Sequence, residues 1–235
     1  ECFGPLEVAY ERSTVTREQI EAGPQSMWRY EALLPVVPGA SGRPGLNPGL
    51  TKLVRADNLA AALGAKTVWV KDDSGNPTHS FKDRVVAVAL ENARRLGYET
   101  IACASTGNLA NAVAAAAARA GLTSVVFVPS NLEAGKIVTT AVYGGTLVAI
   151  DGNYDDVNRL CTEVAAQRNW GFVNVNLRPY YAEGSKTVGY EIAEQLGWRL
   201  PDAIVSPVAS GSLLTKVDKA FREFTELGLV AERPY

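Results

Sequence analysis

The residues best suited to chemistry lie together in residues 75–84, which have the sequence GNPTHSFKDR. The glycine and the proline favour a turn, because glycine accepts positive φ and proline fixes φ. Ser80 can cap a helix whose apolar stripe continues to Leu96. Lys82 then lies in the first helical turn, where the helix dipole disfavours a positive charge. A neutral amine is the form that acts as a nucleophile, so Lys82 is the first candidate for catalysis.

Two other segments carry small and polar residues where a strand would lead into a helix. Residues 105–111 (STGNLAN) follow the apolar run 101–104. Hydroxyls, a glycine and an amide at a helix start can bind an anion, although an ordinary Ser/Thr cap would explain one of the hydroxyls. Residues 207–215 (PVASGSLLT) follow the apolar run 203–205. Small residues there let backbone N–H groups approach a phosphate, although the pattern alone is equally typical of a tight turn.

The elements that must position these segments alternate between strand and helix from residue 67 onward. We predict strands at 67–71, 99–104, 123–128, 145–150, 171–175 and 203–208, and helices at about 80–96, 107–120, 132–143, 154–168, 184–196 and 212–227. The strands are rich in Val and Ile without polar alternation, as in strands that are buried on both faces. The pattern predicts an α/β fold with open, mainly parallel sheets and helices on both faces. Because ligands bind beyond the carboxyl ends of parallel strands, the three segments are expected at one edge.

The first part of the chain is less regular. A short strand at 6–10, a helix at 16–22 that is capped by Thr16, and a second helix at 26–34 are expected. Residues 39–48 are rich in Gly and Pro and are expected to form a loop. Residues 51–64 carry a helical apolar stripe that ends at a glycine.

Composition argues against several classes of function. The 235 residues carry a formal net charge of −2 and no block of basic residues, so a nucleic-acid partner is not expected. No apolar run is long enough for a membrane span, and no secretory signal opens the sequence. The three cysteines are far apart and odd in number, which favours a reducing cytosolic compartment over a disulfide framework. Cys2 alone cannot supply the four ligands of a zinc site, so no metal is predicted.

Residues 76–84 resemble the motif Asn-Pro-Thr-x-Ser-Phe-Lys-Asp-Arg of the threonine synthases. These are fold-type II enzymes (tryptophan synthase β-like) that use pyridoxal 5'-phosphate (PLP). The resemblance extends over residues 50–221, and the three segments described above occur in the family's order and at similar spacing. It implies that Lys82 carries PLP as a Schiff base and serves as the catalytic base.

The same resemblance assigns the cofactor contacts. Asn108 would contact the phenolic oxygen of PLP. The cofactor phosphate would be held by the loop formed by Ala209, Ser210, Gly211, Ser212 and Leu213.

Substrate contacts follow in the same way. The resemblance assigns the substrate carboxylate to Ser105, Thr106 and the backbone N–H of Leu109. Basic residues that could bind a substrate phosphate are Lys136, Arg178 and Lys186, although a surface charge is the simpler interpretation of each. His79 is the only histidine; the resemblance does not require it, and we expect a bystander.

The implied reaction converts O-phospho-L-homoserine and water into L-threonine and phosphate. A cysteate synthase, a threonine dehydratase and a non-catalytic fragment are the alternatives. The expected partner is a small-molecule substrate, with a homodimer as a candidate assembly and with neither nucleic acid nor membrane.

The expected domains are an N-terminal segment with part of the large domain (1–81), a small α/β domain (82–185), and the start of the rest of the large domain (186–235). Family members are longer, so the partner of the cofactor's pyridine nitrogen is expected beyond Tyr235.

Overall fold

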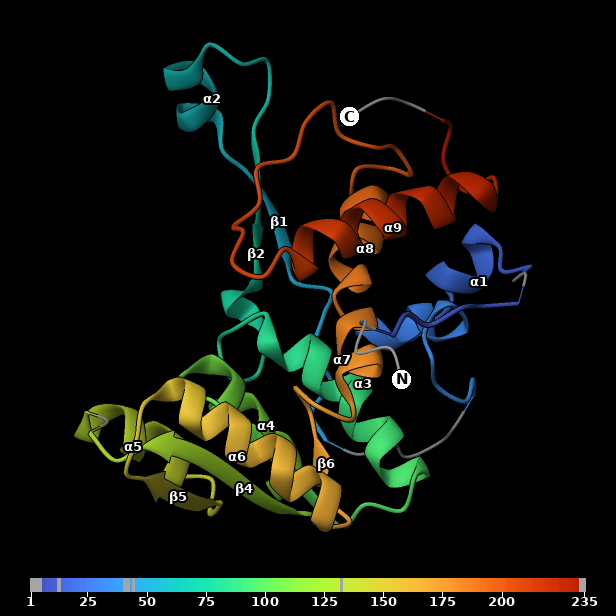
Figure 1. Ribbon diagram of the computed structural model, residues 1–235. Helices are drawn as coiled ribbons and strands as arrows, with labels where there is room; N and C mark the ends of the chain where they lie inside the picture. Colours follow the sequence, from blue (N-terminus) through green and yellow to red (C-terminus); the bar gives the residue numbers. More distant parts are fainter. Residues whose placement is uncertain (1–5, 12–13, 40–42, 44, 132, 233–235) are drawn as a thin grey trace.

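The computed structural model describes residues 6–11, 14–39, 43, 45–131 and 133–232. Figure 1 shows a parallel sheet with its helices at one end of the molecule and a group of helices around α8 and α9 at the other, with α3 between them. The elements of the sheet end are β3 (Thr100–Ala104), α4 (Asn108–Ala120), β4 (Thr123–Pro129), α5 (Ala134–Ala141), β5 (Thr146–Ile150), α6 (Tyr154–Gln167) and β6 (Gly171–Phe172).

The four strands of this sheet are all parallel and lie in the order β5-β4-β3-β6. Successive residues of β3 point to opposite faces, as the pleat requires. Ile101 and Cys103 pack in one buried cluster with α3 and α4, whereas Ala102 and Ala104 pack in another with α6. The sequence prediction of a parallel sheet with helices on both faces is therefore confirmed.

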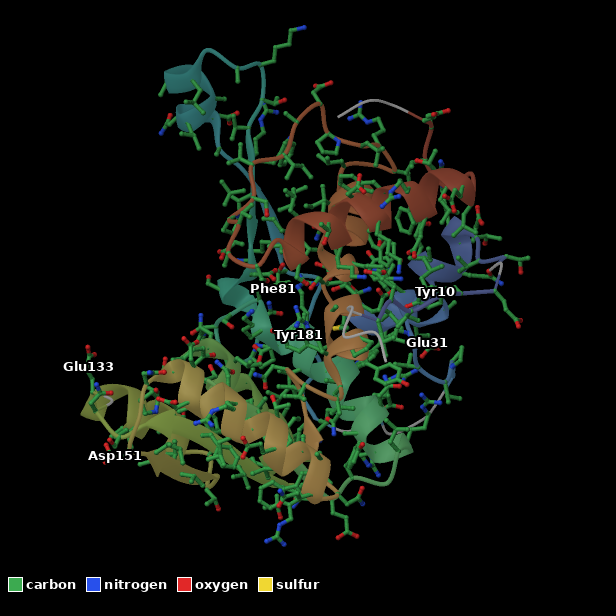
Figure 2. The ribbon with its side chains drawn as sticks, in the orientation of Figure 1. Tyr10, Glu31, Phe81, Glu133, Asp151 and Tyr181 are labelled. Atoms are coloured by element: carbon green, nitrogen blue, oxygen red, sulfur yellow. The ribbon has the colours of Figure 1, made fainter. Side chains whose placement is uncertain are left out.

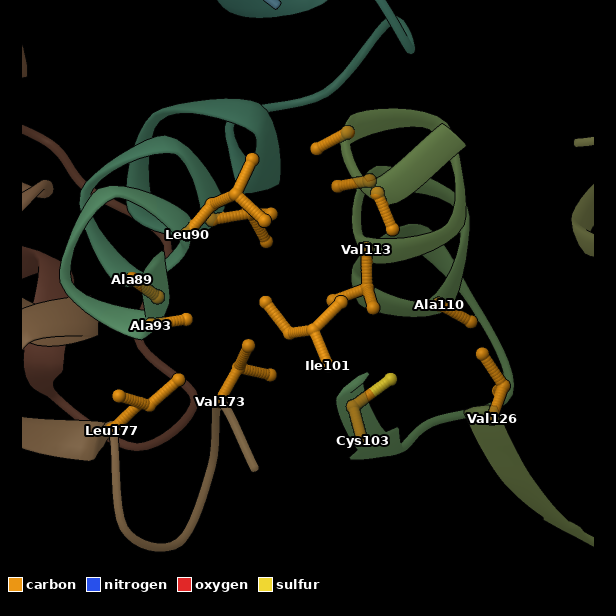
Figure 3. Close-up of a cluster of buried hydrophobic side chains, with 14 of the residues drawn as sticks. Ala89, Leu90, Ala93, Ile101, Cys103, Ala110, Val113, Val126, Val173 and Leu177 are labelled. Atoms are coloured by element: carbon orange, nitrogen blue, oxygen red, sulfur yellow. The ribbon is translucent and has the colours of Figure 1, made fainter. Parts of the chain in front are cut away.

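Helix α3 (Lys82–Arg95) is joined to the sheet by a continuous apolar core. In Figure 3, Leu90 of α3 and Val113 of α4 face each other above Ile101, while Val173 and Leu177 fill the space below α3. All five side chains are fully buried. Each contributes about 1.5–3 kcal/mol by leaving water. This packing fixes the start of α3 relative to the carboxyl end of β3.

A second core forms at the other end of the molecule. Its elements are α1 (Arg17–Glu21), η1 (Met27–Leu33), α8 (Lys186–Gln195) and α9 (Ser212–Glu226), and α7 (Arg178–Glu183) leads from the sheet end into α8. Tyr190 stacks on Phe224 with ring centroids 4.6 Å apart, and Tyr30 lies 5.2 Å from Tyr190. These aromatic contacts join α8, α9 and η1.

A two-stranded antiparallel ribbon corrects one prediction. It consists of β1 (Lys52–Arg55) and β2 (Trp69–Asp72), with α2 (Asp57–Leu63) at its tip, and η2 (Asp73–Gly75) follows β2. The prediction of a buried strand at 67–71 was wrong about burial, because Trp69 and Val70 are 42% and 45% exposed. The helix expected from 51 to 64 instead begins as β1. β-branched and aromatic composition indicates a strand but not its burial, which depends on what covers it.

Two further strand predictions, one near residue 200 and one near the amino end, were also wrong. Residues 203–208 form no strand within the described part of the chain, and residues 6–10 form no strand either. A strand requires a neighbour with which to exchange hydrogen bonds, and the sequence pattern cannot supply that neighbour. Helix α7 was not predicted; its proline, Pro179, lies in the first turn of the helix, where proline is tolerated.

Most helix predictions are confirmed within a few residues, namely those for α3, α4, α5, α6, α8 and α9. Thr16 caps α1 through its hydroxyl, and Gln19 completes a reciprocal capping box. The strand expected at 171–175 is only two residues long. Shortness follows from its position at the end of the sheet, where it pairs with β3 alone.

Across the described residues, no helix is long and apolar enough to cross a membrane. Cys103 and Cys161 are buried and form no disulfide. Cys2 lies outside the described residues. The proposed division at residues 81 and 185 stays a prediction.

Candidate active site

The turn that precedes α3 is held by side chains of the same segment. The carboxylate of Asp83 accepts hydrogen bonds from the backbone N–H and the hydroxyl of Thr78, both at 2.7 Å. The hydroxyl of Ser80 accepts from the backbone N–H of Lys82 at 3.0 Å, although the N-cap of α3 is Phe81, one residue later than predicted. Lys82 is therefore the first residue of α3, and its position is fixed by local hydrogen bonds.

Arg84 lies in the same helical turn and fixes it through buried ion pairs. Sequence reasoning did not identify this role. Its guanidinium is fully buried and donates at 2.8 Å to Asp73 and at 2.8 Å to Glu191. Lys71 of β2 pairs with the same Glu191 at 2.6 Å. Burial acts to lower the pKa of Arg84, but the carboxylates of Glu191 and Asp73 outweigh it and raise that pKa. This network ties α3 to β2 and α8.

The amine of Lys82 is half-buried and has a neutral partner. Its Nζ donates a hydrogen bond to the hydroxyl of Tyr181, 3.1 Å away. Among the described residues, no carboxylate forms an ion pair with this amine. Burial lowers the pKa of Lys82, in the direction predicted from the sequence. The sequence argument also invoked the helix dipole, but the cause found here is burial.

His79 does not face the amine. It adopts a positive φ of 58°, and its Nδ1 lies 3.1 Å from the backbone oxygen of Ser74. The ring is exposed on the preceding turn. Its position agrees with the expectation of a bystander, which stays a prediction.

Tyr154 connects Tyr181 with the segment between β3 and α4, because it is near both. The hydroxyl of Tyr154 donates to the backbone oxygen of Ala104 at 3.1 Å, at the end of β3. Burial raises the pKa of Tyr181, and the nearby Cys103 and Tyr154 raise it further. Lys82, Tyr181 and the end of β3 therefore belong to one region, and Figure 2 shows Phe81 and Tyr181 near the start of α3.

The expected substrate-binding residues follow directly from that strand end. Ser105 is buried, and its hydroxyl accepts from the backbone N–H of Gly107 at 3.3 Å. Thr106 and Leu109 are half-buried, and Asn108, the first residue of α4, is exposed. Backbone N–H groups at the start of this 13-residue helix are directed toward an incoming anion.

The expected phosphate loop precedes α9. Gly211 has a φ of 80° and a Cβ placed there would meet nothing within 4 Å, so the backbone is open to a ligand. Ala209 and Ser210 are exposed, while Ser212 and Leu213 are half-buried. Leu213 packs against the same apolar cluster as Phe81, the neighbour of Lys82. This loop does not follow a strand of the parallel sheet, contrary to the prediction.

The three basic candidates have different surroundings. Arg178 is exposed at the start of α7. Lys136 lies in α5, and its side chain is outside what the structure describes; Glu133, just before α5, is far from Tyr181 in Figure 2. Lys186 is fully buried and pairs with Glu183 at 2.9 Å and Glu223 at 3.1 Å. Because these two carboxylates surround its amine, Lys186 is not included in the proposed site.

Comparison with known proteins identifies the family. The family described as "Pyridoxal-phosphate dependent enzyme" matches residues 46–232. This chain belongs to that family. PLP is therefore the cofactor of this family, as the motif around Lys82 indicated.

Relatives within the family of PLP-dependent enzymes carry a more specific name. The chain is 39% identical to a threonine synthase of Methanosarcina acetivorans over 99% of its own length and 57% of that protein. It is 36% identical to a threonine synthase of Methanocaldococcus jannaschii over 100% of its own length and 58% of that protein. The chain thus spans a little over half the length of these curated relatives.

Solved structures support the fold. Diaminopropionate ammonia lyase from Escherichia coli, in complex with an aminoacrylate-PLP azomethine intermediate, matches with a TM-score of 0.68 and 21% identity. The match covers 92% of this chain and 58% of that one. At this identity the likeness shows the fold alone.

The described residues fit PLP as a cofactor. Lys82 offers an amine whose pKa is lowered and whose hydrogen-bond partner is a neutral hydroxyl. The start of α9, with its open glycine, can receive a phosphate, because free backbone N–H groups and the helix dipole favour an anion there. These two features supply the groups that a PLP-dependent enzyme of this family requires.

Proposed function

We propose that the protein containing this chain is a threonine synthase, which converts O-phospho-L-homoserine and water into L-threonine and phosphate. The observation that carries the proposal is the Lys82 amine, half-buried at the start of α3 and free of carboxylate partners among the described residues. The choice of substrate is supported by relatives that are named threonine synthase and are 36–39% identical.

The cofactor and the side chain of Lys82 have separate roles in the proposed reaction. When bound, PLP supplies an electron sink for negative charge that develops at the substrate Cα. Lys82 removes and returns protons at Cα and Cβ, because burial lowers its pKa and so makes the neutral amine more accessible than in an exposed lysine. Phosphate leaves from Cγ, and water adds at Cβ.

Binding is assigned to the two helix starts. Ser105, Thr106 and the backbone N–H of Leu109 hold the substrate carboxylate, and Asn108 contacts the cofactor. The cofactor phosphate is assigned to the loop that is made of Ala209, Ser210, Gly211, Ser212 and Leu213. Arg178 and Lys136 stay candidates for the substrate phosphate.

The proposed setting is the cytosol. Cys103 and Cys161 are free and buried, which is typical of proteins in a reducing compartment. A homodimer stays a prediction.

The test uses the full-length protein that contains this chain. After addition of PLP and reduction with borohydride, peptide mass mapping should find the cofactor on Lys82. Phosphate release should be rapid with O-phosphohomoserine, and Lys82→Ala should reduce it by about a thousandfold or more. Lys66→Ala, which changes an exposed lysine, should leave it within about twofold.

Two outcomes would contradict the proposal. Phosphate release from O-phosphoserine alone would indicate a cysteate synthase, with the cofactor assignment intact. Near-normal turnover in Lys82→Ala would remove Lys82 from the chemistry altogether.

A further inference from the structure

Tyr181 is the hydrogen-bond partner of the Lys82 amine, although the two residues are 99 positions apart. The tyrosine lies on α7, a short helix that the sequence pattern did not predict. Its hydroxyl oxygen accepts from Nζ at 3.1 Å. Because this bond involves the group assigned to chemistry, the tyrosine controls where that nitrogen lies.

Two aromatic rings enclose the same amine. The Lys82 nitrogen lies 5.4 Å from the ring centroid of Phe81 and 5.8 Å from that of Tyr181. Ring faces attract a cation more weakly than a carboxylate does. The surroundings therefore hold the amine in one place without supplying the negative charge that would keep it protonated.

The position of α7 is fixed by close packing against α3. A Cβ on Gly184 would lie 2.6 Å from the backbone oxygen of Arg84 and 2.7 Å from the Cα of Val85. Only glycine permits that approach. Tyr181 lies almost one helical turn before Gly184, so this contact sets the distance between its hydroxyl and Lys82.

The packing on the other side of Tyr181 is equally defined. Its side chain packs against the buried cluster that joins α3, α4 and the sheet. The neighbouring Tyr154 donates to Ala104 at the end of β3, immediately before Ser105. Tyr181, which bonds to Lys82, therefore lies near Tyr154 and the end of β3, where the segment to which substrate binding is assigned begins.

We propose that Tyr181 is a positioning residue for Lys82, whose amine it holds through an accepted hydrogen bond next to the start of α4. The inference rests on the proposed function only in taking Lys82 as the reactive amine. The hydrogen bond favours the protonated amine, because an acceptor interacts more strongly with an ammonium than with a neutral amine. Loss of the hydroxyl should therefore leave a larger neutral fraction of Lys82 at a given pH.

The experiment measures the chemical reactivity of Lys82 in the full-length protein before PLP is added. Wild type and Tyr181→Phe are labelled with trace acetic anhydride between pH 6 and pH 10, and Lys82 is quantified by mass mapping. Phenylalanine keeps the ring and removes only the oxygen. Near pH 7 we expect Lys82 to be labelled about three to ten times faster in Tyr181→Phe, and its labelling curve to move to lower pH.

Matched controls come from the same chain. Tyr180→Phe alters the adjacent tyrosine, whose ring lies 5.9 Å from the Arg95 guanidinium, and should leave Lys82 labelling unchanged. Lys66, which is exposed, is the internal reference in every digest. Thermal unfolding midpoints of the two variants establish that both are folded under the labelling conditions.

Unchanged or slower labelling of Lys82 in folded Tyr181→Phe would overturn the proposal. If Tyr181→Phe does not fold, Phe81→Leu decides the question, because it removes the other ring and keeps the hydroxyl. A Lys82 labelling curve like that of wild type supports the hydroxyl as the determinant. A shifted curve overturns the proposal. Failure of the proposed function has a different signature, because the labelling shift would persist in a protein that releases no phosphate from O-phosphohomoserine.

Discussion

Lys82 and Lys186 occupy equivalent local positions in two regions of the molecule, and yet their surroundings differ. Each is the first residue of its helix, α3 and α8 respectively. Burial lowers the pKa of both amines. At Lys186 the carboxylates of Glu183 and Glu223 act in the opposite direction, whereas Lys82 has a tyrosine hydroxyl. Position on a helix therefore does not decide what a lysine can do.

The difference teaches that the partner of a buried amine decides its role. Carboxylates favour the charged form of an amine that lies between them, and through such pairs Lys186 joins α7, α8 and α9. An amine that lacks such partners loses its proton more readily and can act on a substrate. Both lysines were candidates from the sequence, and only the three-dimensional neighbours separate them.

The largest expected effect that tests this difference between the two lysines is on the free energy of unfolding. Lys186→Met removes the cation and leaves Glu183 buried with one partner fewer, so we expect unfolding to cost about 3–5 kcal/mol less. Denaturant unfolding measures it. The exposed Lys66→Met, made in parallel, should change that free energy by less than about 0.5 kcal/mol. Equal stability of the two variants would contradict a structural role for Lys186.

A smaller effect is expected on the free energy of unfolding at low pH. Burial acts to raise the pKa of Glu183, but the charge of Lys186 and hydrogen bonds from Lys216 and Tyr10 outweigh it and lower the pKa from 4.5 to about 2. The folded pKa lies below the unfolded one, so this stability is present above pH 4.5 and is lost as the pH falls toward 2. The loss should amount to about 3 kcal/mol.

Unfolding free energies at several pH values between 7 and 2 check this expectation. Glu183→Gln carries no titrating carboxylate at that position, so its stability should fall less steeply over the same range. Parallel curves for wild type and Glu183→Gln would show that other groups cause the acid loss.

The sequence was sufficient wherever structure depends on neighbours along the chain. The helices that carry Lys82 and Asn108 were predicted within two residues, because capping and apolar periodicity are local signals. Burial of residues 67–71 and a strand at 203–208 were predicted wrongly, because burial depends on what covers a strand and strand formation depends on a pairing neighbour.

The same limit applies to the candidate site. The motif identified Lys82, but neither Tyr181 nor the partners of Arg84 follow from it. The hydrogen bond to Tyr181 spans 99 positions and that from Arg84 to Glu191 spans 107. Arg84 immediately precedes the apolar Val85 and Val86 in the predicted helix, which is a signal that a partner exists, because an isolated buried charge is costly, but the sequence does not indicate which one.

The smallest expected effect tests whether His79 belongs to the surroundings of the Lys82 amine. His79 is close to Lys82 in sequence, but its ring contacts the backbone of Ser74 and its φ is 58°. Asn tolerates this left-handed conformation better than most residues do. His79→Asn should therefore leave phosphate release within about twofold and stability within about 0.5 kcal/mol. If the pH dependence of turnover moved in His79→Asn, the histidine would belong to the surroundings of the amine, together with its hydrogen-bond partner Tyr181.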